Sequence, residues 1–196
     1  MQTKNIMIVG VGGQGTLLAS KLLGRLFLKQ GYDVKVSEVH GMSQRGGSVV
    51  TYVRYGSRVY SPLIDKGEAD IILSFELLEA ARWIEFLRPG GIVITNTQQI
   101  NPMPVIMGAA EYPEGLAEKM AAAGIRLDAL DALSLALEAG TQKAVNLVLL
   151  GRLSRQFDFE EERWMEAIQE TVPAKFLAIN RQAFLLGRKT NQLEKA

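Results

Sequence analysis

The sequence has no cysteine among its 196 residues and a single histidine, His40. A thiolate iron–sulfur site, a structural zinc site, a disulfide framework and a cysteine nucleophile all require side chains that are missing here. His40 has no visible partner for a catalytic triad, so a structural role in a loop is the simpler interpretation. The sequence therefore predicts no metal ligands and no catalytic residue of its own.

Charge excess and long apolar runs are also lacking. Lys and Arg number 22 against 21 Asp and Glu, a net charge of +1, which argues against nucleic-acid binding through bulk positive charge. The first apolar run, Ile6-Met7-Ile8-Val9, ends at Gly10. Such a run is too short for the core of a signal peptide or for a membrane span. We therefore expect a cytoplasmic protein that binds neither nucleic acid nor membrane.

Apolar segments instead alternate between strand and helix patterns. A buried strand is expected at 6–9, a helix at 16–30 and a second strand at 33–38, which together make one βαβ unit. Residues 48–55 are dense in Val, Thr and Tyr and predict a further strand, with 58–60 as its hairpin partner.

Later segments continue this alternation and then become helical. Strands are expected at 71–74, 92–95 and 125–129, with helices between them. Beyond residue 130 the pattern is helical, with capping-box spacing at Asp158…Glu161 and a final helix opened by Pro173. The predicted fold class is α/β: a Rossmann-like, doubly wound, mostly parallel sheet with helices on both faces and a helical C-terminal segment. We expect one domain over 1–196, with an α/β core at 1–130 and a helical extension at 131–196.

The clearest motif is a glycine-rich loop between the first strand and the first helix. It reads Gly10-Val11-Gly12-Gly13-Gln14-Gly15, a G-x-G-x-x-G pattern followed by Thr16, whose hydroxyl is a further donor. Glycines allow a tight turn, and a helix N-terminus offers free N–H groups to a phosphate. The alternative is a tight turn that binds nothing. The loop has no Gly-Lys-Ser/Thr ending, so it is not a nucleotide P-loop.

A second polar loop follows the second strand. It runs Glu38-Val39-His40-Gly41-Met42-Ser43-Gln44-Arg45-Gly46-Gly47, and Arg45 before two glycines suits an anion. A solvated surface loop is the alternative interpretation. Lys21, Arg25 and Lys29 share one face of the first helix, and we expect that face to be solvated, with Lys21 nearest to any bound anion.

These motifs resemble a known family. The segments Gly10–Lys21, Glu38–Gly56, Tyr60–Ile64, Gly67–Asp70 and Pro89–Gly91 are similar to the gamma-type subunit of 2-oxoacid:ferredoxin oxidoreductases. The segment His40–Gly47 is most similar to the branch formed by the beta subunit of indolepyruvate ferredoxin oxidoreductase. The resemblance is specific over about the first 110 residues and looser through Asn146–Gly151.

The resemblance implies a share in one reaction. A 2-oxoacid is decarboxylated oxidatively on thiamine diphosphate, the acyl group passes to coenzyme A, and electrons leave through iron–sulfur clusters to ferredoxin. This chain has neither cysteine nor a Gly-Asp-Gly element, so thiamine diphosphate, magnesium and the clusters are expected on a large partner subunit only. Ferredoxin would contact that partner. A homodimer of the isolated chain remains open, and so does the identity of the 2-oxoacid.

The resemblance also assigns coenzyme A to the two loops. By motif position, Gly10, Gly12, Gly13, Gln14, Gly15 and Thr16 would lie at its pyrophosphate, flanked by Ser43, Gln44, Arg45, Gly46 and Gly47. Related fused proteins tend to have lysines where Gln44 stands, so less charge is available here. Two alternatives stay open: a free-standing NAD-binding module that uses Glu38 on the ribose, and a purely structural subunit.

Overall fold

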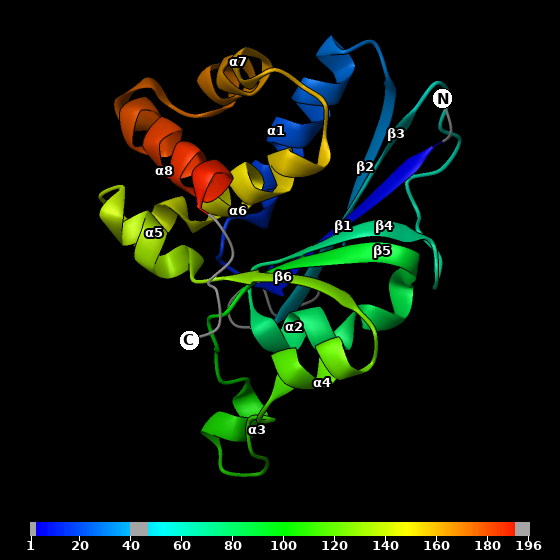
Figure 1. The fold of residues 1–196 in the computed structure, drawn as a ribbon, viewed down its shortest axis with the longest axis vertical. Coiled ribbons are helices and arrows are strands. Elements are labelled where there is room, and N and C mark those ends of the chain that lie inside the picture. Colours follow the sequence, from blue (N-terminus) through cyan, green and yellow to red (C-terminus); the bar gives the residue numbers. More distant parts are fainter. Residues whose placement is uncertain (1–2, 40–46, 191–196) are drawn as a thin grey trace.

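The computed structural model describes residues 3–39 and 47–190 (Figure 1). Its strands form one six-stranded sheet in the order β2-β3-β1-β4-β5-β6. The strands are β1 (Lys4–Val11), β2 (Asp33–Val39), β3 (Ser48–Gly56), β4 (Ala69–Ser74), β5 (Leu87–Asn96) and β6 (Arg126–Leu130).

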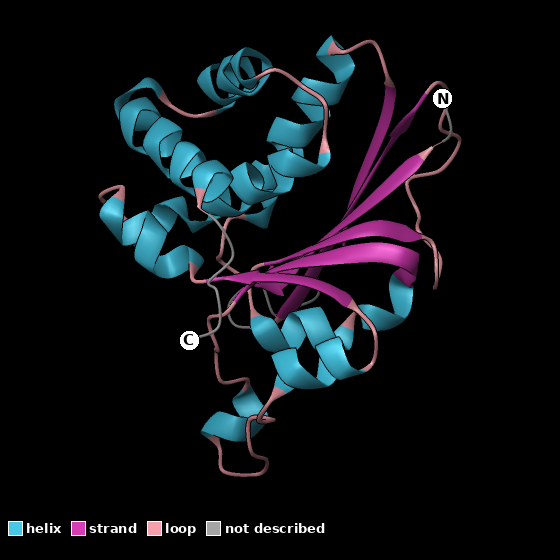
Figure 2. Cartoon of the chain, in the orientation of Figure 1, coloured by secondary structure: helices cyan, strands magenta, loops and turns pink. Residues whose placement is uncertain are grey.

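Helices cover both faces of this sheet (Figure 2). Helices α1, α5, α6, α7 and α8 lie on one side, α2 and α4 lie on the other, and α3 stands away from the sheet on an extended segment (Figure 1). Their bounds are α1 (Thr16–Lys29), α2 (Leu77–Arg82), α3 (Met103–Ile106), α4 (Leu116–Ala122), α5 (Ala132–Glu138), α6 (Val145–Leu153), α7 (Glu161–Thr171) and α8 (Leu177–Lys189). Short 3₁₀ turns occur at Ile84–Phe86, Gln142–Ala144, Ser154–Gln156 and Ala174–Phe176.

The predicted fold class is confirmed, with one difference in strand order. Strands β1, β4, β5 and β6 are mutually parallel, whereas β3 runs antiparallel to both β1 and β2. In the predicted βαβ unit, β1 and β2 would be neighbours in the sheet. In the structure β3 lies between them. The sheet is mixed at this end and parallel at the other.

The prediction that residues 58–60 form a hairpin partner of β3 is wrong. Residues 58–60 form no strand. The N–H of Val59 instead donates to the carboxylate of Asp33 at 2.8 Å, which fixes this segment beside the start of β2 through a side chain. The chain leaving β3 is thus anchored without a ladder, and β3 uses both of its edges for β1 and β2.

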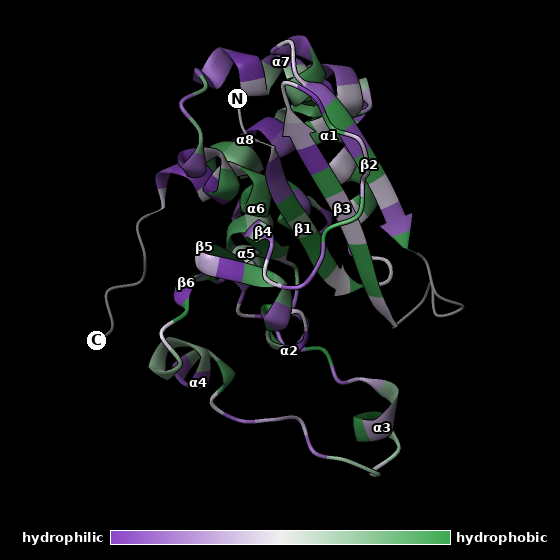
Figure 3. Cartoon of the chain, turned by 90° about the vertical axis from the view of Figure 1, so that its right-hand side faces the viewer, coloured by the Kyte–Doolittle hydropathy of each residue, from purple (hydrophilic) through white to green (hydrophobic). Residues whose placement is uncertain are grey.

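Side-chain alternation along β1 divides the interior into two cores. Ile6 and Ile8 pack with α1 and the C-terminal helices, whereas Met7 and Val9 pack on the side of α2 and α4. All four side chains are almost fully buried, as expected for a central strand covered on both faces. In Figure 3 hydrophobic residues dominate α6, which lies inside, next to the sheet.

Helices α6 and α8 cross at very short range through two glycines. A Cβ on Gly151 would lie 2.0 Å from the carbonyl oxygen of Phe184, and a Cβ on Gly187 would lie 1.9 Å from that of Val148. Any larger side chain at either position would separate the helices. The helical C-terminal segment is therefore locked onto the same core as the sheet.

Two local expectations for the helices need correction. Helix α7 begins at Glu161 with Glu160 as its N-cap residue and without a side-chain cap, so Asp158…Glu161 is not a capping box. The basic face of α1 is not simply solvated, because the Arg25 guanidinium donates to the Glu170 carbonyl and Lys29 pairs with the Glu170 carboxylate. These contacts join α1 to the end of α7, while Lys21 is exposed.

Candidate functional site

The carboxyl ends of the parallel strands β1, β4, β5 and β6 meet at one edge of the sheet. From β1 the chain passes into α1 on one face, and from β4 it passes into α2 on the other face (Figure 1). Open α/β sheets bind ligands in the crevice where neighbouring strands send their connections to opposite faces. The glycine-rich loop after β1 lies at this point.

The backbone of this loop needs its glycines. Gly13 and Gly15 have φ values of +98° and +89°, and Gly15 is the N-cap residue of α1. A Cβ on Gly10 would lie 2.8 Å from the Gln14 side chain and 3.0 Å from Phe75, whereas a Cβ on Gly13 would meet nothing within 4 Å. Gly10 is thus required by close packing, and Gly13 leaves the loop open on its outer side.

Gln14 holds the loop together through its side chain. Its Oε1 accepts from the N–H of Val11 at 2.7 Å, and its Nε2 donates to the carbonyl of Phe75 at 3.1 Å. The oxygen and the nitrogen of this amide are therefore both hydrogen-bonded to backbone groups, one in the loop and one in the segment after β4. Gln14 therefore shapes the site, and its side chain is not free to face a pyrophosphate.

The second predicted loop is only partly described. Ser43, Gln44, Arg45 and Gly46 lie outside the described residues, as does His40. Gly47 is described, and its carbonyl accepts from the N–H of Gly12 at 2.9 Å. The two glycine-rich loops therefore meet at a backbone hydrogen bond.

Glu38 is hydrogen-bonded to α1, and Thr16, the first residue of α1, is buried. Glu38 accepts a hydrogen bond from the hydroxyl of Ser20 in α1 at 3.0 Å, and β3 separates its strand from β1. Thr16 is buried, with 8% of its surface exposed. The geometry expected for a ribose-binding acid next to the glycine loop is not formed.

A cavity of about 530 Å³ opens at the start of α1. Its lining includes Gly13, Gly15, Gln98, Gln142 and Lys143. No side chain accepts a hydrogen bond from the N-terminal N–H groups of α1, and the first turn of the helix contains no acidic residue. These N–H groups therefore keep the partial positive charge of a helix N-terminus. Lys143 is exposed and, within the described part of the chain, its ammonium makes no ion pair. This cavity favours an anion.

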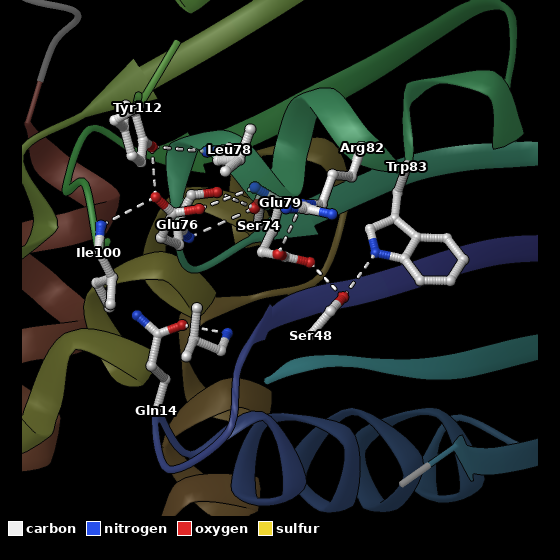
Figure 4. Close-up of polar contacts among 11 residues, drawn as sticks. Gln14, Ser48, Ser74, Glu76, Leu78, Glu79, Arg82, Trp83, Ile100 and Tyr112 are labelled. Atoms are coloured by element: carbon white, nitrogen blue, oxygen red, sulfur yellow. Dashed lines mark hydrogen bonds and ion pairs between the residues drawn. The ribbon is translucent and has the colours of Figure 1, made fainter. Parts of the chain in front are cut away.

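A second cavity, of about 510 Å³, opens beside Val11 at the end of β1 and Gly47 before β3. Two buried carboxylates line it, and Figure 4 shows their contacts. Glu76 is 1% exposed and accepts from the N–H of Ile100 at 3.1 Å, the N–H of Glu79 at 2.8 Å and the hydroxyl of Tyr112. Glu76 thereby caps α2 and attaches the segment that carries α3 to the sheet edge.

Glu79 is the second carboxylate, with 5% of its surface exposed. It accepts from the hydroxyl of Ser48, and its Oε1 lies 3.3 Å from the guanidinium of Arg82 (Figure 4). Burial raises the pKa of Glu79 above its ordinary value, and the bond to Ser48 and the charge of Arg82 only partly oppose this shift. Burial and the bond to Glu76 likewise raise the pKa of the Tyr112 hydroxyl.

Sequence reasoning missed Glu76, Glu79, Tyr112 and Lys143. For Glu76 a signal was present, because it is the second residue after the buried strand at 71–74, and the ends of parallel strands supply functional groups. Lys143 and Tyr112 offered no such signal, since each reaches the site from a distant part of the chain.

Residues 3–39 and 47–190 contain neither a metal-binding cluster nor a membrane-spanning helix. No group of three or more His, Asp or Glu side chains there is arranged to hold a metal ion. No helix in those ranges is both long and apolar enough to cross a membrane.

Comparison with known proteins agrees with the fold and with the motifs. The chain is 48% identical over 194 residues to the indolepyruvate oxidoreductase subunit IorB of Thermococcus kodakarensis, with 96% of each chain covered. The structure resembles a keto/oxoacid ferredoxin oxidoreductase gamma subunit from Geobacter sulfurreducens, with a TM-score of 0.71 and 20% identity over 95% of this chain and 96% of that one.

The same fold occurs within a longer chain. A 2-oxoglutarate:ferredoxin oxidoreductase from Magnetococcus marinus matches with a TM-score of 0.71 and 19% identity, over 98% of this chain but 32% of that one. The model of the family described as pyruvate ferredoxin/flavodoxin oxidoreductase matches residues 5–190. The chain therefore belongs to the pyruvate ferredoxin/flavodoxin oxidoreductase family.

Proposed function

We propose that this chain is the small subunit of an indolepyruvate:ferredoxin oxidoreductase and that it works in the cytoplasm. That enzyme decarboxylates a 2-oxoacid oxidatively, passes the acyl group to coenzyme A and delivers the electrons to ferredoxin. The relative from Thermococcus kodakarensis, which carries indolepyruvate in its name, supports this substrate because it matches nearly the whole chain.

The second part of the proposal is a coenzyme A phosphate site at the start of α1. The observation that carries it is the open cavity where Gly13, Gly15 and Lys143 meet at an uncapped helix N-terminus. A pyrophosphate suits this place because backbone N–H groups and an ammonium are offered together and no acidic side chain stands in the first turn of α1. The subunit would act by positioning the acyl acceptor, without a catalytic acid or base of its own.

In this proposal the cofactors of the reaction are bound by a partner subunit. Thiamine diphosphate, magnesium and the iron–sulfur clusters are held by a large subunit, since this chain has no cysteine for a cluster. Ferredoxin would then contact the large subunit. The match to about a third of the Magnetococcus chain supports such an association, because there the same fold is joined to further polypeptide.

Reconstitution tests the proposal. The chain and its large subunit are produced separately and together, and coenzyme A-dependent reduction of ferredoxin is followed with indolepyruvate, pyruvate and a branched 2-oxoacid. We expect activity only when both subunits are present, with indolepyruvate preferred. Full activity of the large subunit alone, or a clear preference for a non-aromatic 2-oxoacid, would contradict it.

Thermal unfolding of the assembled enzyme tests the ligand separately. Coenzyme A should raise the melting temperature, whereas NAD should not, because only a ligand that binds the folded state stabilises it. Stabilisation by NAD alone would identify a dinucleotide site and overturn the coenzyme A assignment.

A further inference from the structure

A smaller cavity, of about 160 Å³, lies at the edge of the sheet where the parallel strands begin, opposite the glycine loop. Its lining includes residues near the amino ends of four strands: Lys4 in β1, Asp70 in β4, Arg88 in β5 and Arg126 in β6. Pockets for cofactors usually measure about 300–1,000 Å³, so this cavity has room only for a small ligand. The proposed coenzyme A site does not involve it.

The lining of this cavity is cationic. Lys4, Arg88 and Arg126 stand against one carboxylate, that of Asp70, which leaves a balance of two positive charges. Asp70 Oδ1 lies 3.3 Å from Lys4 Nζ and 2.8 Å from Arg88 Nε, so Asp70 holds both cations beside the cavity. Arg126 is exposed, and its guanidinium makes no ion pair within residues 3–39 and 47–190. Its charge is therefore available to a ligand.

The hydroxyl of Tyr55 adds a neutral donor. Tyr55 lines the cavity although only 5% of its surface is exposed, and its ring is stacked on that of Phe27 at a centroid distance of 3.8 Å. Burial, together with the nearby Tyr32 and Asp70, raises the pKa of Tyr55, so its hydroxyl stays protonated. This hydroxyl forms no hydrogen bond with any residue that the structure describes. A ligand acceptor in the cavity would provide the missing partner.

We propose that this cavity binds a compact tetrahedral oxyanion, phosphate or sulfate. A guanidinium group can donate to two oxygens of one anion, and an ammonium and a phenol each add a further donor. Such a donor set needs three or more acceptor oxygens, which a tetrahedral oxyanion has and a carboxylate or a halide lacks. Sulfate and doubly ionised phosphate also carry the two negative charges that balance the lining.

Calorimetric titration of the full chain tests the site, with sodium phosphate, sodium sulfate and sodium chloride compared at constant ionic strength. We expect phosphate and sulfate to bind and chloride not to bind, and the tighter of the two identifies the preferred anion. Equal responses to all three salts would show only charge screening and would overturn the proposal.

Two arginine variants locate the bound anion. Arg126→Met should raise the dissociation constant of phosphate about tenfold, which corresponds to roughly 1.4 kcal/mol for a lost charge-assisted contact. Arg163→Met, a matched change of an exposed arginine on α7, should leave this constant unchanged. Equal effects of the two substitutions would contradict a specific site.

Tyr55→Phe separates binding from folding, because it removes only the hydroxyl. We expect the dissociation constant of phosphate to rise about fivefold. Without phosphate the free energy of unfolding in urea should not fall, since the wild-type hydroxyl has no hydrogen bond to the described chain. Lower stability with unchanged phosphate affinity would show that the hydroxyl is structural and would contradict the proposal.

Lys143→Met distinguishes this cavity from the start of α1, where phosphate can also bind if the coenzyme A proposal is correct. We expect Lys143→Met to leave the oxyanion affinity of the smaller cavity unchanged. If Lys143→Met weakens phosphate and Arg126→Met does not, or if the wild-type chain binds neither oxyanion, this inference fails. The coenzyme A proposal is decided separately by the response of the assembled enzyme to coenzyme A.

Discussion

The N–H of Gly12 donates a hydrogen bond to the carbonyl of Gly47 at 2.9 Å. The bond joins the glycine loop after β1 to the residue that precedes β3, so the two glycine-rich segments meet although 35 positions separate them. Because β1 and β3 are paired from Lys4 and Tyr55 to Val11 and Ser48, the bond extends their ladder into the site. The loop geometry is thus fixed by the sheet.

The crossing of α6 and α8 predicts opposite effects of alanine at two glycines. Gly151→Ala should lower the free energy of unfolding by about 3 kcal/mol or more, because its Cβ would lie 2.0 Å from the Phe184 carbonyl oxygen. Gly24→Ala, inside α1, should raise it by about 0.5–1 kcal/mol, since its Cβ would make an ordinary contact of 3.7 Å with Val36. Urea unfolding of both variants checks the pair, and equal effects would contradict the close approach.

The hydrogen bonds of Glu76 predict the result of an isosteric change. In Glu76→Gln one oxygen becomes an NH₂ group, which must face the N–H of either Ile100 or Glu79. We expect a loss of about 2 kcal/mol in the free energy of unfolding, against about 1 kcal/mol for Tyr112→Phe, which removes the hydroxyl that donates to Glu76 and accepts from the N–H of Leu78. Chemical unfolding measures both. A smaller loss for Glu76→Gln than for Tyr112→Phe would show that the carboxylate is not the centre of this network.

Burial of Glu79 predicts a dependence of stability on pH. Its pKa is raised in the folded protein, so between the ordinary value of 4.5 and the raised value the folded state binds more protons than the unfolded state. The free energy of unfolding therefore loses the contribution of Glu79 as the pH rises through this window. Glu79→Gln cannot ionise, so its stability relative to the wild type should increase from about pH 4 to about pH 7.

Urea unfolding across this pH range provides the measurement. Ser48→Ala offers a companion variant, because the hydrogen bond from Ser48 lowers the pKa of Glu79 and its removal should extend the decline to higher pH. A difference between Glu79→Gln and the wild type that stays constant over the range would refute the burial effect.

The strands, the main helices and the glycine loop were predictable from the sequence because their signals are local. The run Ile6–Val9 and the glycines that follow it identify strand, turn and helix start within a few residues. The insertion of β3 between β1 and β2 was not predictable, since strand pairing depends on long-range contacts that leave no periodicity in either strand.

In the candidate site, too, the residues with local sequence signals were predictable and those brought together by the fold were not. Gly13 and Gly15 were identified from their spacing, but the outward face of the loop is completed by Gln98 and Lys143, which come from other connections of the fold. The role of Gln14 could not be inferred either, because its side chain turns back to Val11 and Phe75 only once β1 and β4 are neighbours.

The most direct test of the coenzyme A site compares two substitutions of equal size at Gly13, where a Cβ would meet nothing within 4 Å. Asp and Asn share the strain of φ +98° and both tolerate positive φ better than other side chains, so they differ mainly in one negative charge. Calorimetric titration of coenzyme A into the assembled enzyme should give a dissociation constant at least about tenfold higher for Gly13→Asp than for Gly13→Asn. Equal dissociation constants for the two variants would contradict a phosphate at this loop.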